Sequence, residues 1–290
     1  MNTSTNLNER LGYAPDTKLL IIHADDVGLS HAENQATFDA MATGMVSSAS
    51  IMVPCPWFTD SAAYVRAHPA LDIGVHITLT SEWKYYRWGS VASASDVPSL
   101  LDEQGYLHAS SMDVATHADP REAEIEARAQ IERALAFGIQ PTHIDTHMGS
   151  ICFTPDLFAV YLKLGREYNL PLLLIAPMID NMGLRDMLQP SDIVLDKLFI
   201  PRDAGPIHRW EDHMRSVFAE LAPGVSQMIV HLAYDNAEMR AIGVDHPDYG
   251  SAWRQWEFDM VTHPTFATLL TEYDIQLITW REVGKLLVSE

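Results

Sequence analysis

Short apolar runs rich in Ile, Val and Leu alternate along the chain with longer segments whose apolar residues recur at helical spacing. This alternation predicts parallel strands joined by right-handed helical crossovers. Because no Pro-, Gly- or Ser-rich linker interrupts it, we expect one α/β domain over residues 18–290, an irregular barrel, after an N-terminal tail at residues 1–17. The predicted strands are residues 18–24, 47–53, 72–79, 142–147, 172–176, 227–232 and 275–279.

Polar residues punctuate the predicted helices. Ser30 and Glu33 form the pattern of a capping box directly after the first strand, and Gly44 closes that helix. Asp119 followed by Pro120 predicts the start of a second helix. Residues 85–111 carry no regular pattern, and a loop that long in a compact domain is usually functional.

Composition narrows the setting of the protein. The chain has 290 residues, 47% of them hydrophobic, and a formal net charge of −20, which argues against binding nucleic acid or an anionic membrane surface. Two cysteines are too few for a disulfide framework. The polar N-terminus lacks the apolar core of a signal peptide, and no apolar stretch approaches the ~20 residues of a membrane span, so we expect a cytoplasmic protein.

Titratable residues gather at the ends of the predicted strands. Asp25 and Asp26 follow the first strand, and His76 lies in the third. The sequence "THIDTH" contributes Asp145 and His147, and a late strand ends at His231. Because α/β barrels collect their catalytic groups at the carboxyl ends of the strands, these residues predict one site, with the nitrogen and oxygen ligands that a zinc-like ion prefers.

Each signal also has a structural explanation. A single His such as His76 in an apolar strand is more often a hydrogen-bonded core residue, and the dipole of the following helix can stabilise the Asp pair. In an extended strand His143 and His147 share a face but lie about 13 Å apart, so at most one of them is expected to be a direct ligand. Seven other histidines are interpreted as surface or structural residues: His23, His31, His68, His117, His208, His213 and His263.

These motifs resemble the YdjC/ChbG-type carbohydrate deacetylases. The opening "LLIIHADDVGLSHAENQATFDAMATGMVSSASIMV", the later "IGVHITLT" and then "PTHIDTH" are similar to the family's motifs and follow in the same order. The resemblance covers nearly the whole chain from residue 18. It implies a NodB-like (β/α) barrel that removes the N-acetyl group of an amino sugar or short chito-oligosaccharide with the help of one divalent metal ion.

Carried over to this chain, the resemblance makes Asp26, His76 and His147 the metal ligands, Asp25 the general base and His231 the general acid. Zinc is the expected ion, with magnesium or another divalent metal as alternatives. The chain departs from the family pattern after His147, where residues 148–150 include no further histidine. It also departs in the late strand, where the family's His-Pro-Gly or His-Pro-Ala is replaced by His231-Leu232-Ala233.

Other residues carry weaker predictions. Asp145 lies on the same side of its strand as His147 and either orients an imidazole or caps a backbone amide. Trp83 and Tyr85 either stack on a sugar ring or anchor the long loop. The other readings are a glycosidase, disfavoured because adjacent carboxylates on an extended strand point to opposite faces, and a non-catalytic sugar-binding protein. The expected partner is a small amino-sugar substrate, and a homodimer is left open.

Overall fold

The computed structural model describes residues 6–201, 209–244 and 246–287, and within them the strands form one parallel sheet. The strand order is β4-β3-β2-β1-β6-β5, and β7 pairs with the start of β1. The sheet curls into a half-barrel, which confirms the predicted α/β barrel in a single domain. The strands are β1 (Lys18–Val27), β2 (Ser48–Ile51), β3 (Ile73–Ile77), β4 (Ile144–Thr146), β5 (Lys197–Phe199), β6 (Gly224–Val230) and β7 (Ile275–Leu277).

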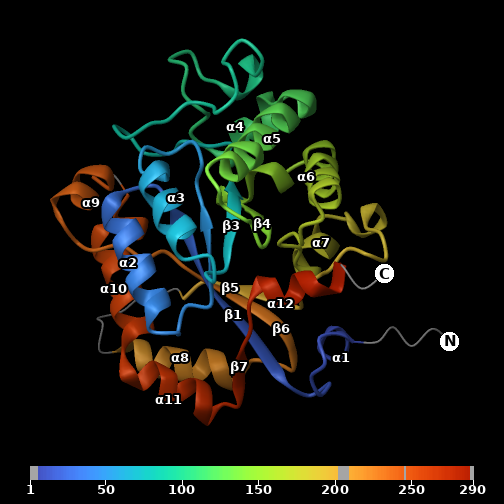
Figure 1. The fold of residues 1–290 in the computed structure, drawn as a ribbon, viewed down its shortest axis with the longest axis vertical. Helices are drawn as coiled ribbons and strands as arrows, with labels where there is room; N and C mark the ends of the chain where they lie inside the picture. Colours follow the sequence, from blue (N-terminus) through green and yellow to red (C-terminus); the bar gives the residue numbers. More distant parts are fainter. Residues whose placement is uncertain (1–5, 202–208, 245, 288–290) are drawn as a thin grey trace.

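The helices cover the outside of the sheet. In Figure 1, β1 crosses the middle of the molecule, with α2, α3 and α10 on one side and α6 and α7 on the other. The helices are α1 (Leu7–Arg10), α2 (His31–Ala42), α3 (Phe58–Ala67), α4 (Ser111–His117), α5 (Pro120–Ala136), α6 (Pro155–Tyr168), α7 (Ala176–Asn181), α8 (Trp210–Ala219), α9 (Ala237–Ile242), α10 (Ser251–Thr262), α11 (Pro264–Glu272) and α12 (Trp280–Gly284).

Six of the seven predicted strands overlap a strand of the sheet, and one does not. Residues 172–176 are not a strand; they make only isolated bridges, from Leu172 to Ile144 and from Ile175 to Leu195. The short half-buried β5, which the sequence analysis missed, pairs with β6 instead. Residues 172–176 therefore lie between β4 and the segment before β5, where they extend the barrel without a regular ladder.

The predicted helix starts are correct in position but not in every contact. Ser30 caps α2 by accepting a hydrogen bond from the backbone N–H of Glu33. The predicted return contact, from the Glu33 side chain to the backbone at Ser30, is wrong because the Glu33 carboxylate pairs with Arg254. Asp119 caps α5 as predicted, with Pro120 in the first turn.

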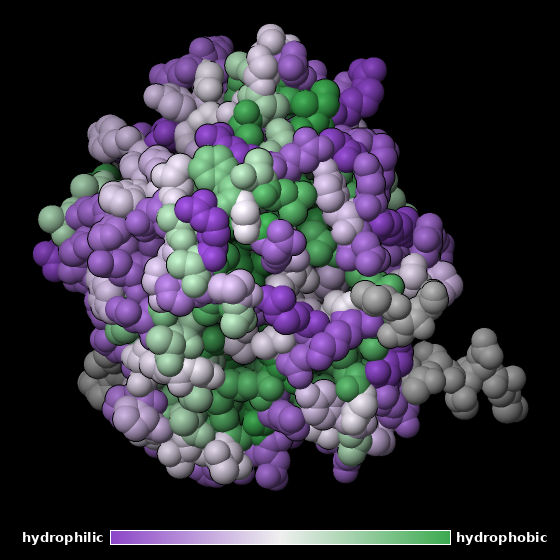
Figure 2. All heavy atoms as spheres, in the orientation of Figure 1, coloured by the Kyte–Doolittle hydropathy of each residue, from purple (hydrophilic) through white to green (hydrophobic). Residues whose placement is uncertain are grey.

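Two apolar clusters hold the layers together. The larger one packs the outer helices against the sheet, and the smaller one fills the inside of the half-barrel around Leu19, Ile21 and Trp280. Leu7 and Tyr13, which precede β1, pack against the smaller cluster. The face shown in Figure 2 is mostly hydrophilic, with hydrophobic side chains gathered near its middle. No helix in the described ranges is both long and apolar enough to cross a membrane.

Candidate metal and catalytic site

The predicted site residues meet in one cavity at the carboxyl ends of the strands. The cavity has a volume of about 550 Å³, and its lining includes Asp25, Asp26, His147 and His231. His76 lies on β3, which β2 separates from β1 in the sheet, and its side chain reaches both aspartates. The topology explains this meeting, because β1 lies in the sheet between β2 and β6 and all of these strands run in the same direction.

The two adjacent aspartates face the same site, which corrects the expectation that they point to opposite faces. Asp26 has a left-handed backbone with a φ of 68°, and the pairing of β1 with β2 shifts register between Ala24 and Val27. A strand that bulges in this way no longer alternates its side chains from face to face. Both carboxylates consequently approach Nε2 of His76, Asp26 Oδ1 at 3.4 Å and Asp25 Oδ2 at 3.8 Å.

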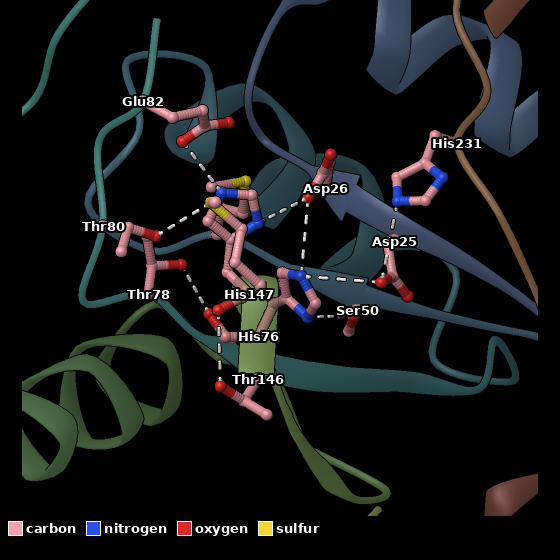
Figure 3. Close-up of polar contacts among 12 residues, drawn as sticks. Asp25, Asp26, Ser50, His76, Thr78, Thr80, Glu82, Thr146, His147 and His231 are labelled. Carbon is pink, nitrogen blue, oxygen red and sulfur yellow. Dashed lines mark hydrogen bonds and ion pairs between the residues drawn. The ribbon is translucent and has the colours of Figure 1, made fainter. Parts of the chain in front are cut away.

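Asp26, His76 and His147 form a compact set of metal-ligand atoms. One potential ligand atom from each lies within 4.8 Å of the other two, and all three residues are buried. His147 Nδ1 is 3.1 Å from Asp26 Oδ1. Neither Asp26 Oδ1 nor His76 Nε2 has a hydrogen-bond partner within the described part of the chain. Figure 3 shows the three side chains converging. Two imidazoles and one carboxylate suit a divalent ion such as zinc, so the residues present fit the metal that the resemblance implies.

Asp145 lies behind His76 and not beside His147. Its Oδ1 is 2.8 Å from His76 Nδ1, and its Oδ2 accepts a hydrogen bond from Ser50. This contact directs Nε2 of His76 towards Asp26, as carboxylates behind histidine ligands commonly do. The Asp145 carboxylate thus contacts the imidazole of His76, a partner that the sequence did not indicate.

His23 was read as a structural or surface residue, and it is fully buried beside the site. Its Nε2 lies 3.0 Å from Asp145 Oδ2 and 3.3 Å from Asp25 Oδ1. Its Nδ1 contacts the hydroxyl of Ser48 at 3.1 Å. His23, His143 and Asp145 also lie close enough together to hold an ion. Both ring nitrogens of His23, however, already contact other side chains. His208 lies outside the described residues.

Arg254 supplies the permanent positive charge next to Asp26. Its Nη2 donates to Asp26 Oδ2 at 2.9 Å, and its Nη1 pairs with the buried Glu33. Burial favours a protonated Asp26, but His147 and Arg254 outweigh it and hold the pKa of this carboxyl well below its usual range. Burial also dominates at Glu33, whose pKa is raised well above its usual value despite Arg254.

The histidines of the set respond to the surrounding carboxylates. Burial lowers the pKa of His147, but Glu82 and Asp26 outweigh it and raise the pKa to about 9. Burial is likewise outweighed at His76, where Asp145 and Asp25 raise the pKa well above its usual value. In the absence of an ion, protons therefore compensate the negative charge of this cluster.

Asp25 and His231 lie together at one side of the metal-ligand set. His231 Nε2 is 4.0 Å from Asp25 Oδ2, and the ring is partly open to the cavity (Figure 3). Burial raises the pKa of Asp25, although His76 and His23 oppose the shift. The buried Glu257 accepts the backbone N–H of His231 and lies 3.7 Å from its Nδ1. The Asp25 carboxylate and the His231 ring therefore face the same cavity.

The aromatic residues of the long loop differ in position. Trp83 is only 2% exposed, lines the cavity and packs against Arg254 and the ring of His246. Tyr85 is 75% exposed and does not contribute to the cavity lining. Trp83 thus combines an anchoring role with a surface towards the cavity, whereas Tyr85 points to solvent.

Sequence reasoning missed Glu33, Glu82, Arg254 and Glu257. Glu82 Oε2 lies 3.1 Å from Nε2 of His147. Glu33 was assigned only to a helix cap, and the other three stand outside any strand-end motif. A signal existed in principle: Arg254 lies among apolar residues on a helix, where an arginine needs an acidic partner.

Comparison with known proteins agrees with the site. The sequence pattern of the YdjC-like protein family matches residues 19–272. The chain belongs to this family. It is 32% identical to a carbohydrate deacetylase of Thermus thermophilus, over 97% of this chain and 99% of that one. It is also 34% identical, over 58% of its length and 63% of the relative, to a chitooligosaccharide deacetylase of Yersinia pestis.

A solved structure gives the same picture of the fold. A crystal structure from Enterococcus faecalis, described as a candidate cellobiose-phosphate cleavage protein, superimposes with a TM-score of 0.78 at 27% identity, covering 92% of this chain and 99% of that one. The family and its deacetylase homologues indicate that this chain is a carbohydrate deacetylase, with buried His and Asp residues able to bind a metal ion.

Proposed function

We propose that the chain hydrolyses the N-acetyl group of an amino sugar or short chito-oligosaccharide in a metal-dependent reaction that releases acetate. The observation that carries the proposal is the placement of the Asp26, His76 and His147 ligand atoms, within 4.8 Å of one another, beside the Asp25–His231 pair in one cavity. The named relatives support the substrate class.

Asp26, His76 and His147 would hold the ion. When bound, a divalent ion lowers the pKa of a coordinated water and polarises a carbonyl oxygen. Two nitrogen ligands and one carboxylate favour zinc, with magnesium as the alternative. Arg254 leaves Oδ1 of Asp26 available by binding Oδ2, and Asp145 fixes the ring of His76.

The proton transfers belong to Asp25 and His231. Asp25 accepts a proton from the attacking water, and His231 donates one to the amine nitrogen as the C–N bond breaks. Their separation of 4.0 Å lets both reach one amide group from the same side of the ligand set. Trp83 and Glu82 border the space next to the ligands, where the sugar would lie.

A glycosidase is the main alternative, since the two aspartates do face one site. It requires a protonated carboxyl group as general acid. Asp25 would be that acid, because burial raises its pKa, whereas His147 and Arg254 hold the pKa of Asp26 low. The names of the relatives instead favour amide hydrolysis.

Acetate release distinguishes these functions. The protein is stripped with a chelator, reloaded with zinc or magnesium, and incubated with N-acetylglucosamine oligomers of increasing length. We expect acetate and free amine in equal amounts, and neither from the stripped protein. Appearance of new reducing ends without acetate would indicate a glycosidase, and saturable sugar binding without any product would indicate a binding protein.

A further inference from the structure

The cavity has a second region whose lining differs from that of the catalytic groups. Six aliphatic side chains line this region, and we call them the aliphatic pocket. They come from residues 173–178, from β5 and the residue that follows it, and from β6: Leu173, Ile175, Met178, Leu198, Ile200 and Ile229. None of these side chains is a hydrogen-bond donor, and their one acceptor is the weak thioether sulfur of Met178. The cavity lining also includes Glu82, Trp83, Tyr249 and Arg254.

The aliphatic pocket directly adjoins the proton-transfer pair. Ile229 precedes His231 by two residues, so both side chains lie on the same side of the sheet, and His231 lies 4.0 Å from Asp25. In the pairing of β1 with β6, Ile229 is the partner of His23, which precedes Asp25 by two residues on β1. A group bound in the aliphatic pocket would therefore extend from the reacting amide.

The pocket is open towards the cavity and is not simply closed core. Leu198, Ile200 and Met178 are only half-buried, although they line a cavity deep enough to contain buried charges. Leu173 and Ile175 belong to the buried cluster around Trp280, and Met178 and Leu198 pack against that cluster while also lining the cavity. These half-buried side chains gain stability only when an apolar ligand covers them.

Chemistry decides which part of an N-acylated sugar fits there. A sugar hydroxyl placed against aliphatic side chains would lose its hydrogen bonds, at a cost of ~1–3 kcal/mol each. The alkyl part of the acyl chain carries no hydroxyl group and is the most apolar segment of the substrate. The cavity of about 550 Å³ is in the size range of pockets for drug-sized ligands, whereas an acetyl group offers the aliphatic pocket a single methyl.

We propose that the aliphatic pocket binds the acyl chain and that the enzyme prefers acyl groups longer than acetyl, such as butyryl or hexanoyl, on the amino sugar. The inference rests on the amide hydrolysis proposed above. The reaction balances in the same way: the oxygen of water bonds to the acyl carbon, the C–N bond breaks, and the nitrogen takes a proton. The products are a short-chain carboxylate and the free amino sugar.

A chain-length series tests the preference with the metal-loaded protein. Glucosamine and chitobiose carrying N-acetyl, N-butyryl or N-hexanoyl groups are compared by their kcat/KM values. Each methylene transferred into an apolar site is worth ~0.8 kcal/mol, so the two added in butyryl should increase kcat/KM by about 15-fold over acetyl. The wild-type series tests the inference even if a variant does not fold.

Two matched variants locate the effect. Leu198→Ser makes the aliphatic pocket polar and should reduce the butyryl-to-acetyl ratio by about fourfold, the equivalent of one methylene. Leu277→Ser, at a half-buried Leu of β7 outside the cavity, should leave the ratio unchanged.

Three outcomes would overturn the inference, and they are distinguishable. Equal or higher kcat/KM for acetyl would refute the acyl-chain preference and leave the deacetylase function standing. A butyryl preference that survives Leu198→Ser, or falls equally in Leu277→Ser, would refute the assignment to this pocket. Absence of hydrolysis for every acyl group would refute both the inference and the proposed function.

Discussion

Arg254→Met is the substitution with the most direct structural consequence. Arg254 is buried, its Nη2 lies 2.9 Å from Asp26 Oδ2, and its Nη1 pairs with Glu33, which is also fully buried. Methionine keeps much of the side-chain volume but removes the positive charge. Glu33 then loses its cation, and Asp26 keeps only its contacts with His76 and His147.

The magnitude follows from the burial of all three groups. Breaking a buried ion pair by removing one partner costs ~3–5 kcal/mol. Unfolding entropy near 60 °C is ~2.1 cal/mol/K per residue, so for 290 residues the entropy is about 0.6 kcal/mol/K and the loss should lower Tm by about 5–8 °C.

Thermal melts of the chelator-treated protein measure this change. Arg215→Met serves as the control, because Arg215 pairs with Glu211 and Glu272 at partly exposed positions and such pairs contribute at most ~1 kcal/mol. Adding Glu33→Gln to Arg254→Met should recover part of the loss, since one uncompensated carboxylate is then removed. A melt of Arg254→Met within about 1 °C of wild type, or no difference from Arg215→Met, would refute the reasoning.

The site residues carry four further predictions. Asp25→Asn should keep its metal by elemental analysis while acetate release falls ~10²–10⁴-fold, the usual contribution of a general base; loss of the ion would show that Asp25 is a ligand. Asp26→Ala should lose metal affinity in calorimetric titration, since the set loses its only carboxylate. His231→Ala should lower kcat with metal content unchanged, and undiminished turnover would exclude it as the acid. Asp145→Asn should weaken metal binding ~10–100-fold through the freed His76 ring, and unaltered affinity would contradict that role.

The sequence predicted those parts of the fold that depend on contacts between residues close together in the chain. The apolar run of β1, the Ser30 cap and the Asp119–Pro120 start of α5 each depend on contacts within a few residues. The edge of the sheet depends on distant partners instead. Residues 172–176 have the composition of a strand, yet their neighbours offer only single bridges, so no ladder forms.

The same distinction applies to the site. Strand ends brought Asp26, His76 and His147 into one prediction because parallel strands deliver their carboxyl ends to one edge. The left-handed turn at Asp26 was not predictable from a pattern of alternating faces. Arg254 was missed because its partner Glu33 is 221 residues away, and a pair at that separation leaves no local pattern.

Two adjacent buried carboxylates can coexist because their surroundings treat them differently. Asp26 is compensated by His147 and Arg254, which keep its pKa low and the carboxylate available as a ligand. Asp25 meets no arginine among the described residues, and burial raises its pKa against the opposing effect of His76 and His23. A carboxylate with a raised pKa is a stronger base than an exposed aspartate, so its affinity for a proton is greater when water attacks the amide. The bulge turns both side chains towards one cavity and thus places a strongly ionised carboxylate beside a more basic one, as the proposed metal-binding and proton-accepting roles require.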